Sequence, residues 1–123
     1  EGEKVVALYI IEVLLAKESS YIIIDEPESH LNLAIVNKFW DMLIEERKDC
    51  HFIFISHHID FITSRNNSEL VWCESFNYPD EWKLEKISDI DNLPTELIVQ
   101  LIGTKKLVIL CEGNKSNSLD YKV

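Results

Sequence analysis

The chain has 123 residues, 46% of them hydrophobic, which is enough for one small domain with a hydrophobic core. Its net charge of −10 argues against a generic nucleic-acid surface, because phosphate binding depends on clustered lysines and arginines and the 12 basic residues here are scattered. No stretch approaches the roughly 18 consecutive apolar residues of a membrane span. Cys50, Cys73 and Cys111 are far apart and form no CxxC pair, which favours reduced thiols and a cytoplasmic protein without a membrane partner.

The first half of the sequence predicts a strand–helix–strand unit. Residues 4–17 (KVVALYIIEVLLAK) are apolar almost all round and predict a buried helix. Residues 21–24 (YIII) form a short apolar run, typical of a strand buried on both faces of a parallel sheet. Residues 33–48 have apolar side chains at helical spacing, and residues 50–56 (CHFIFIS) predict a second buried strand. Two strands joined by one helix predict a right-handed βαβ unit.

The pattern changes after a short helix predicted at residues 59–64. Residues 70–76 and 82–87 predict two strands around a Tyr-Pro-Asp turn, and therefore a β-hairpin at the edge of the sheet. The remaining predicted elements are a linker at residues 89–94, a short helix at 95–102 ended by Gly103, and an apolar strand at 105–113.

Two adjacent carboxylates, Asp25 and Glu26, end the first predicted strand and are followed by Pro27. Ligands of open α/β sheets bind outside the carboxyl ends of the strands. Pro27 restricts Glu26 to extended conformations as the chain turns, so we expect both carboxylates to face one crevice. Magnesium is usually bound through one or two carboxylates plus substrate phosphates, and a second carboxylate can orient a water for attack. The alternative is a solvated turn with two surface acids.

The segment YIIIDEPESHLN, residues 21–32, resembles the Walker B and D-loop segment of ATP-binding-cassette (ABC) ATPases. The resemblance implies that Asp25 is the magnesium-side residue and that Glu26 is the catalytic glutamate that polarises the attacking water. It also implies that Ser29 and Asn32 belong to the D-loop, which binds nucleotide across a partner subunit. The sequence EPESHLN, residues 26–32, resembles the corresponding segment of the chromosome-maintenance, recombination-repair and overcoming-lysogenization-defect (OLD) branches more than that of the transporters.

Two further segments resemble the same family. FIFISHHIDFI resembles its switch-histidine segment and assigns that role to His57, because a neutral imidazole at a strand end can bond a γ-phosphate and sense its loss. An exposed polar pair, or a metal site, is the alternative for His57 and His58. EGEK resembles the tail of the family signature, which implies that Gly2 and Glu3 contact the nucleotide held by the other subunit.

A phosphate-binding loop of the form GxxxxGK[ST] is missing from the sequence, because its only glycines are Gly2, Gly103 and Gly113. We therefore expect that loop to lie upstream in a longer protein. We also expect the 123-residue chain alone to bind ATP very weakly and to hydrolyse none.

The last residues, LVILCEGNKSNSLDYKV, resemble the opening of a Toprim-type domain, where an apolar strand ends in Glu-Gly. The resemblance implies that Glu112 is a magnesium ligand, one of several carboxylates used for phosphoryl transfer on nucleic acid. A strand-end acid beside a turn glycine is the alternative. An ATPase followed directly by a Toprim domain is the arrangement of OLD-like proteins.

These features together predict an α/β fold: a three-layer, P-loop NTPase-like fragment with parallel core strands, helices on its faces and an added β-hairpin. Residues 1–93 are assigned to the C-terminal part of an ABC-type ATPase domain, and residues 94–123 to a linker helix and the start of a Toprim-like domain. The expected function is an ATP-binding and ATP-hydrolysing module of an OLD-like protein in DNA repair or antiphage defence. It would use Mg²⁺, form a head-to-tail homodimer, and reach DNA or RNA through the longer protein. An ABC-transporter ATPase subunit and a non-catalytic interaction domain are the alternatives.

Overall fold

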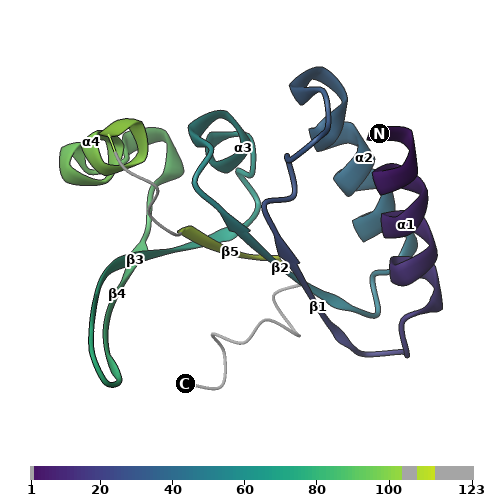
Figure 1. The fold of residues 1–123 in the computed structure, drawn as a ribbon, viewed down its shortest axis with the longest axis horizontal. Coiled ribbons are helices and arrows are strands. Elements are labelled where there is room, and N and C mark those ends of the chain that lie inside the picture. Colours follow the sequence, from purple (N-terminus) through teal and green to yellow (C-terminus); the bar gives the residue numbers. More distant parts are fainter. Residues whose placement is uncertain (1, 104–107, 113–123) are drawn as a thin grey trace.

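The computed structural model describes residues 2–103 and 108–112, the latter by their backbone alone, and these residues form a five-stranded sheet with helices packed on it (Figure 1). The elements are α1 (Gly2–Leu15), β1 (Tyr21–Asp25), α2 (Leu33–Glu46), β2 (His51–Ser56), α3 (Ile59–Thr63), β3 (Glu69–Asn77), β4 (Glu81–Ile87), the 3-10 helix η1 (Ile90–Asn92), α4 (Thr95–Gly103) and β5 (Val108–Glu112). The strand order is β1-β2-β5-β3-β4. The described helices include none long and apolar enough to cross a membrane.

The mixed α/β class is confirmed, together with two of the predicted units. β1 and β2 pair in parallel with α2 between them in the chain, as the βαβ pattern predicts. β3 and β4 form the antiparallel hairpin, and β4 lies at one edge of the sheet, with β1 at the other. The prediction of a parallel core is wrong for the third central strand, because β5 lies antiparallel between β2 and β3. An apolar run predicts a strand but does not encode the direction in which it pairs.

The prediction of helices on both faces of the sheet is also wrong, since the helices lie on one side (Figure 1). Phe54 of β2 shows why this side forms the core. Trp40 of α2 lies 5.1 Å from the Phe54 ring and Phe61 of α3 lies 5.5 Å from it, measured between ring centroids. Tyr9 of α1 contacts Trp40 in turn, at 5.0 Å. One aromatic cluster therefore joins three helices to one face of β2.

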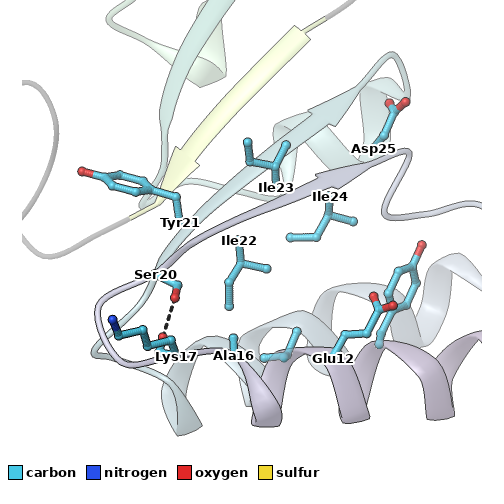
Figure 2. Close-up of a pocket in the computed structure, with 11 residues that line it drawn as sticks. Glu12, Ala16, Lys17, Ser20, Tyr21, Ile22, Ile23, Ile24 and Asp25 are labelled. Atoms are coloured by element: carbon cyan, nitrogen blue, oxygen red, sulfur yellow. Dashed lines mark hydrogen bonds between the residues drawn. The ribbon is translucent and has the colours of Figure 1, made fainter.

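The opposite face of the sheet is open along β1, which corrects the expectation that residues 21–24 are buried on both faces. Ile24 is 5% exposed, whereas its neighbour Ile23 is 64% exposed. Side chains alternate along a strand, so Ile22 and Ile24 lie on the α1 side and Ile23 lies on the other side (Figure 2). The apolar run thus correctly predicts the strand but not what covers it.

The helix predicted at residues 4–17 is present as α1, but it is not buried. Val13 is the only buried residue of α1, at 2% exposure. Four large apolar residues of α1 are exposed: Leu8, Ile11, Leu14 and Leu15. A helix that is apolar all round can still present only one side to β1 and α2, and the described residues cover no more of it.

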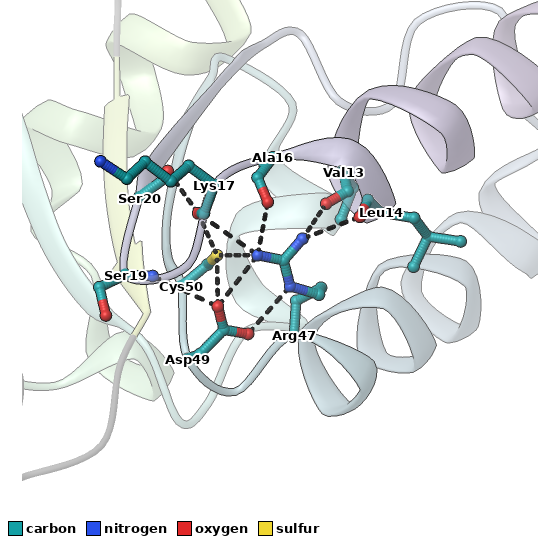
Figure 3. Close-up of polar contacts among 9 residues, drawn as sticks. All are labelled: Val13, Leu14, Ala16, Lys17, Ser19, Ser20, Arg47, Asp49 and Cys50. Atoms are coloured by element: carbon teal, nitrogen blue, oxygen red, sulfur yellow. Dashed lines mark hydrogen bonds and ion pairs between the residues drawn. The ribbon is translucent and has the colours of Figure 1, made fainter.

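The carboxyl-terminal end of α1 is held by the guanidinium of Arg47, which follows α2 (Figure 3). Arg47 donates hydrogen bonds to four carbonyl oxygens, those of Val13, Leu14, Ala16 and Lys17, at 2.6–3.4 Å. The last carbonyls of a helix have no partner within the helix and carry partial negative charge, so a cation there stabilises the helix end. Asp49 accepts two hydrogen bonds from Arg47, both of 2.9 Å, and orients the guanidinium.

Acid is expected to weaken this contact. The hydrogen bond from Arg47 holds the pKa of Asp49 well below its usual range. A carboxyl group whose folded pKa is depressed stabilises the fold above the unfolded-state value of about 4, and this contribution is lost as pH falls below it. We therefore expect Asp49→Asn to flatten the dependence of urea-unfolding free energy on pH below about pH 4.5. Asp80→Asn, in the hairpin turn, is the matched control, and an unchanged slope in Asp49→Asn would contradict the role of the pair.

Candidate functional site

The parallel pairing of β1 and β2 brings the predicted acids and the predicted histidine to one edge of the sheet. Asp25, the last residue of β1, is in register with Ile55 of β2. β2 ends one residue later at Ser56, and His57 follows directly. Carboxyl ends of adjacent parallel strands meet at the same edge, which is where open α/β sheets bind ligands.

Glu26 has a left-handed backbone, with φ of 50°, which corrects the expectation that Pro27 keeps it extended. Three hydrogen bonds hold it there. Its amide donates to the Ile55 carbonyl at 2.8 Å, its carbonyl accepts from the Ser29 amide at 2.9 Å, and its Oε2 accepts from Ser29 Oγ at 2.9 Å. A left-handed conformation costs a non-glycine residue of order 1–3 kcal/mol, and such residues cluster at functional sites. The chain therefore turns at Glu26, directly after β1 ends at Asp25.

This backbone strain has a measurable consequence. Glu26→Gly is expected to be more stable than Glu26→Ala by about 1 kcal/mol, because glycine adopts positive φ without the steric penalty that Cβ imposes. Both variants lose the carboxylate and its bond to Ser29, so the difference isolates the backbone. The measurement is the free energy of unfolding in urea. An alanine variant as stable as the glycine variant would show that position 26 is not strained.

His57 faces Glu26 across the edge of the sheet. Its Nδ1 lies 3.5 Å from Glu26 Oε1, and the two side chains are 37% and 50% exposed, respectively. Glu26 therefore has Ser29 at one carboxylate oxygen and His57 near the other. A carboxylate with one oxygen held by a hydrogen bond, beside an imidazole and open to solvent, can receive a proton from a water molecule.

Asp25 can contribute to a magnesium site but cannot form one alone. Its side chain is exposed, and no hydrogen bond or ion pair engages its carboxylate among the residues that the structure describes. Within that same part of the chain, no three His, Cys, Asp or Glu side chains are grouped closely enough to hold a metal ion. Magnesium commonly uses one or two protein carboxylates, with phosphates and waters completing its shell. The donor set fits a nucleotide-bound Mg²⁺ and does not fit an all-protein site.

The two residues predicted in the D-loop have defined local contacts. Ser29 donates its hydroxyl to Glu26, as described above, so it orients the predicted catalytic carboxylate. Asn32 is the N-cap of α2, and its side chain accepts a hydrogen bond of 2.9 Å from the Ala34 amide. N-caps of this type stabilise a helix by about 1 kcal/mol, which explains where α2 begins. Contact of either residue with a nucleotide stays a prediction.

Gly2 and Glu3, in the first turn of α1, lie at this edge as well. A Cβ atom on Gly2 would lie 2.7 Å from the carbonyl oxygen of His30, so the start of α1 touches the backbone between Ser29 and Asn32. The two segments assigned to nucleotide contact across a subunit boundary are therefore neighbours. Glu3 is exposed.

This close approach predicts opposite effects for two glycines. Gly2→Ala is expected to lower stability by about 1–3 kcal/mol, because neither backbone can move aside easily. Gly103→Ala, in α4, is the matched control, since a Cβ atom there meets nothing within 4 Å. Alanine is the better helix former, so that variant is expected to be unchanged or more stable by up to about 1 kcal/mol. Thermal unfolding of both variants checks the prediction, which equal effects would contradict.

Glu112 lies away from this edge. It is the last residue of β5 and pairs with Phe52, near the start of β2 and opposite the end that carries His57. Its side chain, and residues 113–123 of the Toprim-like segment, lie outside the described residues. The assignment of Glu112 as a metal ligand stays a prediction.

Three residues beside the site were not assigned a role from the sequence. Glu28 and Ser56 are buried, at 8% and 1% exposure, and Ser56 Oγ donates a hydrogen bond of 2.8 Å to Glu28 Oε1. The third is Tyr9 of α1. Burial, and then the negative charges of Glu12, Glu28 and Asp25, raise the pKa of its phenol, which therefore stays protonated at neutral pH. These side chains are far apart in sequence: the pairing of β1 with β2 brings Glu28 to Ser56, and the packing of α1 on the sheet adds Tyr9.

An open pocket of about 350 Å³ lies between α1 and the edge strand β1 (Figure 2). Asp25 lines it, and Glu12 and Tyr9 line it from α1, while Ile22 and Ile24 form its apolar wall. The pocket shows that α1 and β1 are not fully packed together near Asp25.

No family model, curated protein or solved structure matches this chain.

Proposed function

We propose that this chain carries the hydrolytic half of an ABC-type ATPase site. The observation that carries the proposal is the placement of Glu26 and His57, 3.5 Å apart, where two parallel strands end. Activation of a water molecule beside a γ-phosphate needs a carboxylate to orient the water and a group that contacts the phosphate. The positive φ of Glu26 fits a functional role for that residue, because residues with a strained backbone cluster at functional sites.

The residues have separate roles in this proposal. Glu26 receives the proton of the attacking water, and the bond from Ser29 fixes its orientation. His57, whose Nδ1 faces Glu26, has Nε2 left to contact the γ-phosphate group, as a donor when the imidazole is protonated or through a bridging water molecule when it is neutral. Asp25 would hold Mg²⁺ directly or through water, and the bound ion would supply neutralisation of the charge on the phosphoryl group.

A second copy of the ATPase module completes the site in this proposal. Gly2 lies beside the backbone of His30, and in this proposal Gly2, Glu3 and residues 29–32 provide the surface that contacts a nucleotide held by the partner. Hydrolysis also needs a phosphate-binding loop, and this sequence has none. The proposal therefore places that loop in a longer protein, assembled head to tail.

The wider role follows from the resemblance to OLD-like proteins. The module is proposed to couple ATP hydrolysis to a Toprim-type nuclease domain in DNA repair or antiphage defence. The sequence motif that supports this coupling is LVILCEG, residues 107–113. Any contact with DNA or RNA is assigned to the longer protein, since the net charge of this chain is −10.

Phosphate release tests the proposal. The 123-residue chain is mixed with ATP and Mg²⁺ and compared with a longer polypeptide that adds a P-loop. We expect turnover from the longer polypeptide, loss of that turnover when Mg²⁺ is chelated, and none from the shorter chain. Turnover by the shorter chain would contradict a half site. A longer polypeptide that binds ATP without hydrolysing it would contradict catalysis.

A further inference from the structure

We propose that Glu28 is a positioning residue, which holds His57 opposite Glu26 through the hydroxyl of Ser56. The inference rests on the function proposed above and adds a residue that the sequence patterns do not identify. It starts from the hydrogen bond between Ser56 Oγ and Glu28 Oε1, which joins the loop after β1 to the end of β2.

The hydroxyl of Ser56 makes two hydrogen bonds, which hold the residues on both sides of His57. Ser56 precedes it and donates its hydroxyl proton to Glu28 at 2.8 Å. His58 follows it, and the His58 backbone amide donates to Ser56 Oγ at 3.0 Å. The peptide units on both sides of His57 are thereby tied to Glu28. The direction in which the imidazole leaves the sheet is consequently fixed by a residue 29 positions earlier in the chain.

Burial gives this arrangement its strength. Ser56 and Glu28 are 1% and 8% exposed, so water does not compete freely for the bond between them. The second carboxylate oxygen, Glu28 Oε2, is buried without a hydrogen-bond partner among the described residues. A buried carboxylate is unfavourable unless it is paired, so a glutamate that served packing alone would be better replaced by an apolar residue.

The tautomer of His57 reports the positioning directly. In the 123-residue chain, at high pH where imidazoles are neutral, Nδ1 facing Glu26 predicts the Nδ1–H tautomer. Neutral histidine in water favours Nε2–H instead. Ring nitrogen NMR shifts distinguish the two forms. We expect Glu28→Ala and Ser56→Ala to shift His57 toward Nε2–H, and Glu28→Gln and Ser56→Thr to retain Nδ1–H, because both still form the bond. Ser20→Ala, whose hydroxyl bonds to Lys17 at the other end of β1, is the control.

Nδ1–H retained in both alanine variants would overturn the proposal. If the alanine variants do not fold, the test is the hydrogen-exchange rate of the His58 amide, measured in the wild-type chain and in Ser56→Thr. We expect the His58 amide to be protected about 2- to 10-fold beyond exposed loop amides in both, the range for one net hydrogen bond. An unprotected His58 amide in the wild-type chain would overturn the proposal.

A kinetic comparison separates this inference from the proposed function. In the longer polypeptide, Glu28→Ala is expected to lower kcat with KM for ATP little changed, and Glu28→Gln to restore it. Absence of ATPase activity in the wild-type longer polypeptide would contradict the proposed function. The NMR measurement of the His57 tautomer would still test the positioning role of Glu28. Full activity in Glu28→Ala would overturn the positioning role and leave the ATPase assignment intact.

Discussion

Glu26→Gln in a longer polypeptide that contains the P-loop is expected to lower the rate of ATP turnover by about 10²- to 10⁴-fold, the usual contribution of a positioned general base. ATP binding should persist, because an amide keeps the size of the side chain and an oxygen that can accept from Ser29 Oγ. The measurement is phosphate release under saturating ATP and Mg²⁺, together with the dissociation constant for ATP.

Glu18→Gln is the matched control, because Glu18 is an exposed acid in the turn between α1 and β1. It removes the same charge away from the carboxyl ends of β1 and β2, and its turnover should equal that of the wild type. Turnover in Glu26→Gln within a factor of about two of the control would remove Glu26 from the chemistry.

Trp40→Ala is expected to lower the free energy of unfolding by about 3–5 kcal/mol, the usual cost of removing a large aromatic side chain from a core. Trp40 is fully buried and its ring contacts Tyr9, Phe39 and Phe54. It also supports the site, because its Nε1 donates a hydrogen bond of 3.1 Å to the carbonyl of Pro27, directly after Glu26. Urea unfolding of the 123-residue chain gives the value.

Two comparisons separate the parts of the Trp40 effect. Trp40→Phe keeps an aromatic ring but leaves the Pro27 carbonyl without its donor, which is expected to cost about 1–3 kcal/mol. Trp82→Ala removes the same side chain from the hairpin, where it is 57% exposed and contacts Phe76. A change within about 1 kcal/mol is expected there. Equal losses at positions 40 and 82 would contradict the placement of the core.

The sequence predicts the elements of the fold better than their surroundings. The pattern in residues 21–24 identifies β1, because an apolar run bounded by polar residues is a local property. That Ile23 is 64% exposed depends on which segments cover the sheet, and periodicity carries no such information. The hairpin β3–β4 is predictable for the same local reason, whereas the antiparallel insertion of β5 depends on distant pairing.

The candidate site was predictable only in part. Asp25, Glu26 and His57 follow strands in the sequence, and parallel pairing of β1 and β2 is enough to bring those strand ends together. The rule that a residue before proline is extended gave the wrong backbone for Glu26, because three hydrogen bonds outweigh that local preference. Glu28 is one polar residue in a loop until the fold places it beside Ser56, 28 positions later.

Nucleotide-dependent dimerisation of Glu26→Gln tests the central claim most directly. The variant is prepared in the longer polypeptide with its P-loop, and its molar mass is measured by light scattering with Mg²⁺ and either ATP or ADP. Because hydrolysis is blocked while binding persists, the account predicts a doubling of mass with ATP and a monomer with ADP. The same mass with both nucleotides would contradict the claim that these residues form half of a shared ATP-hydrolysing site.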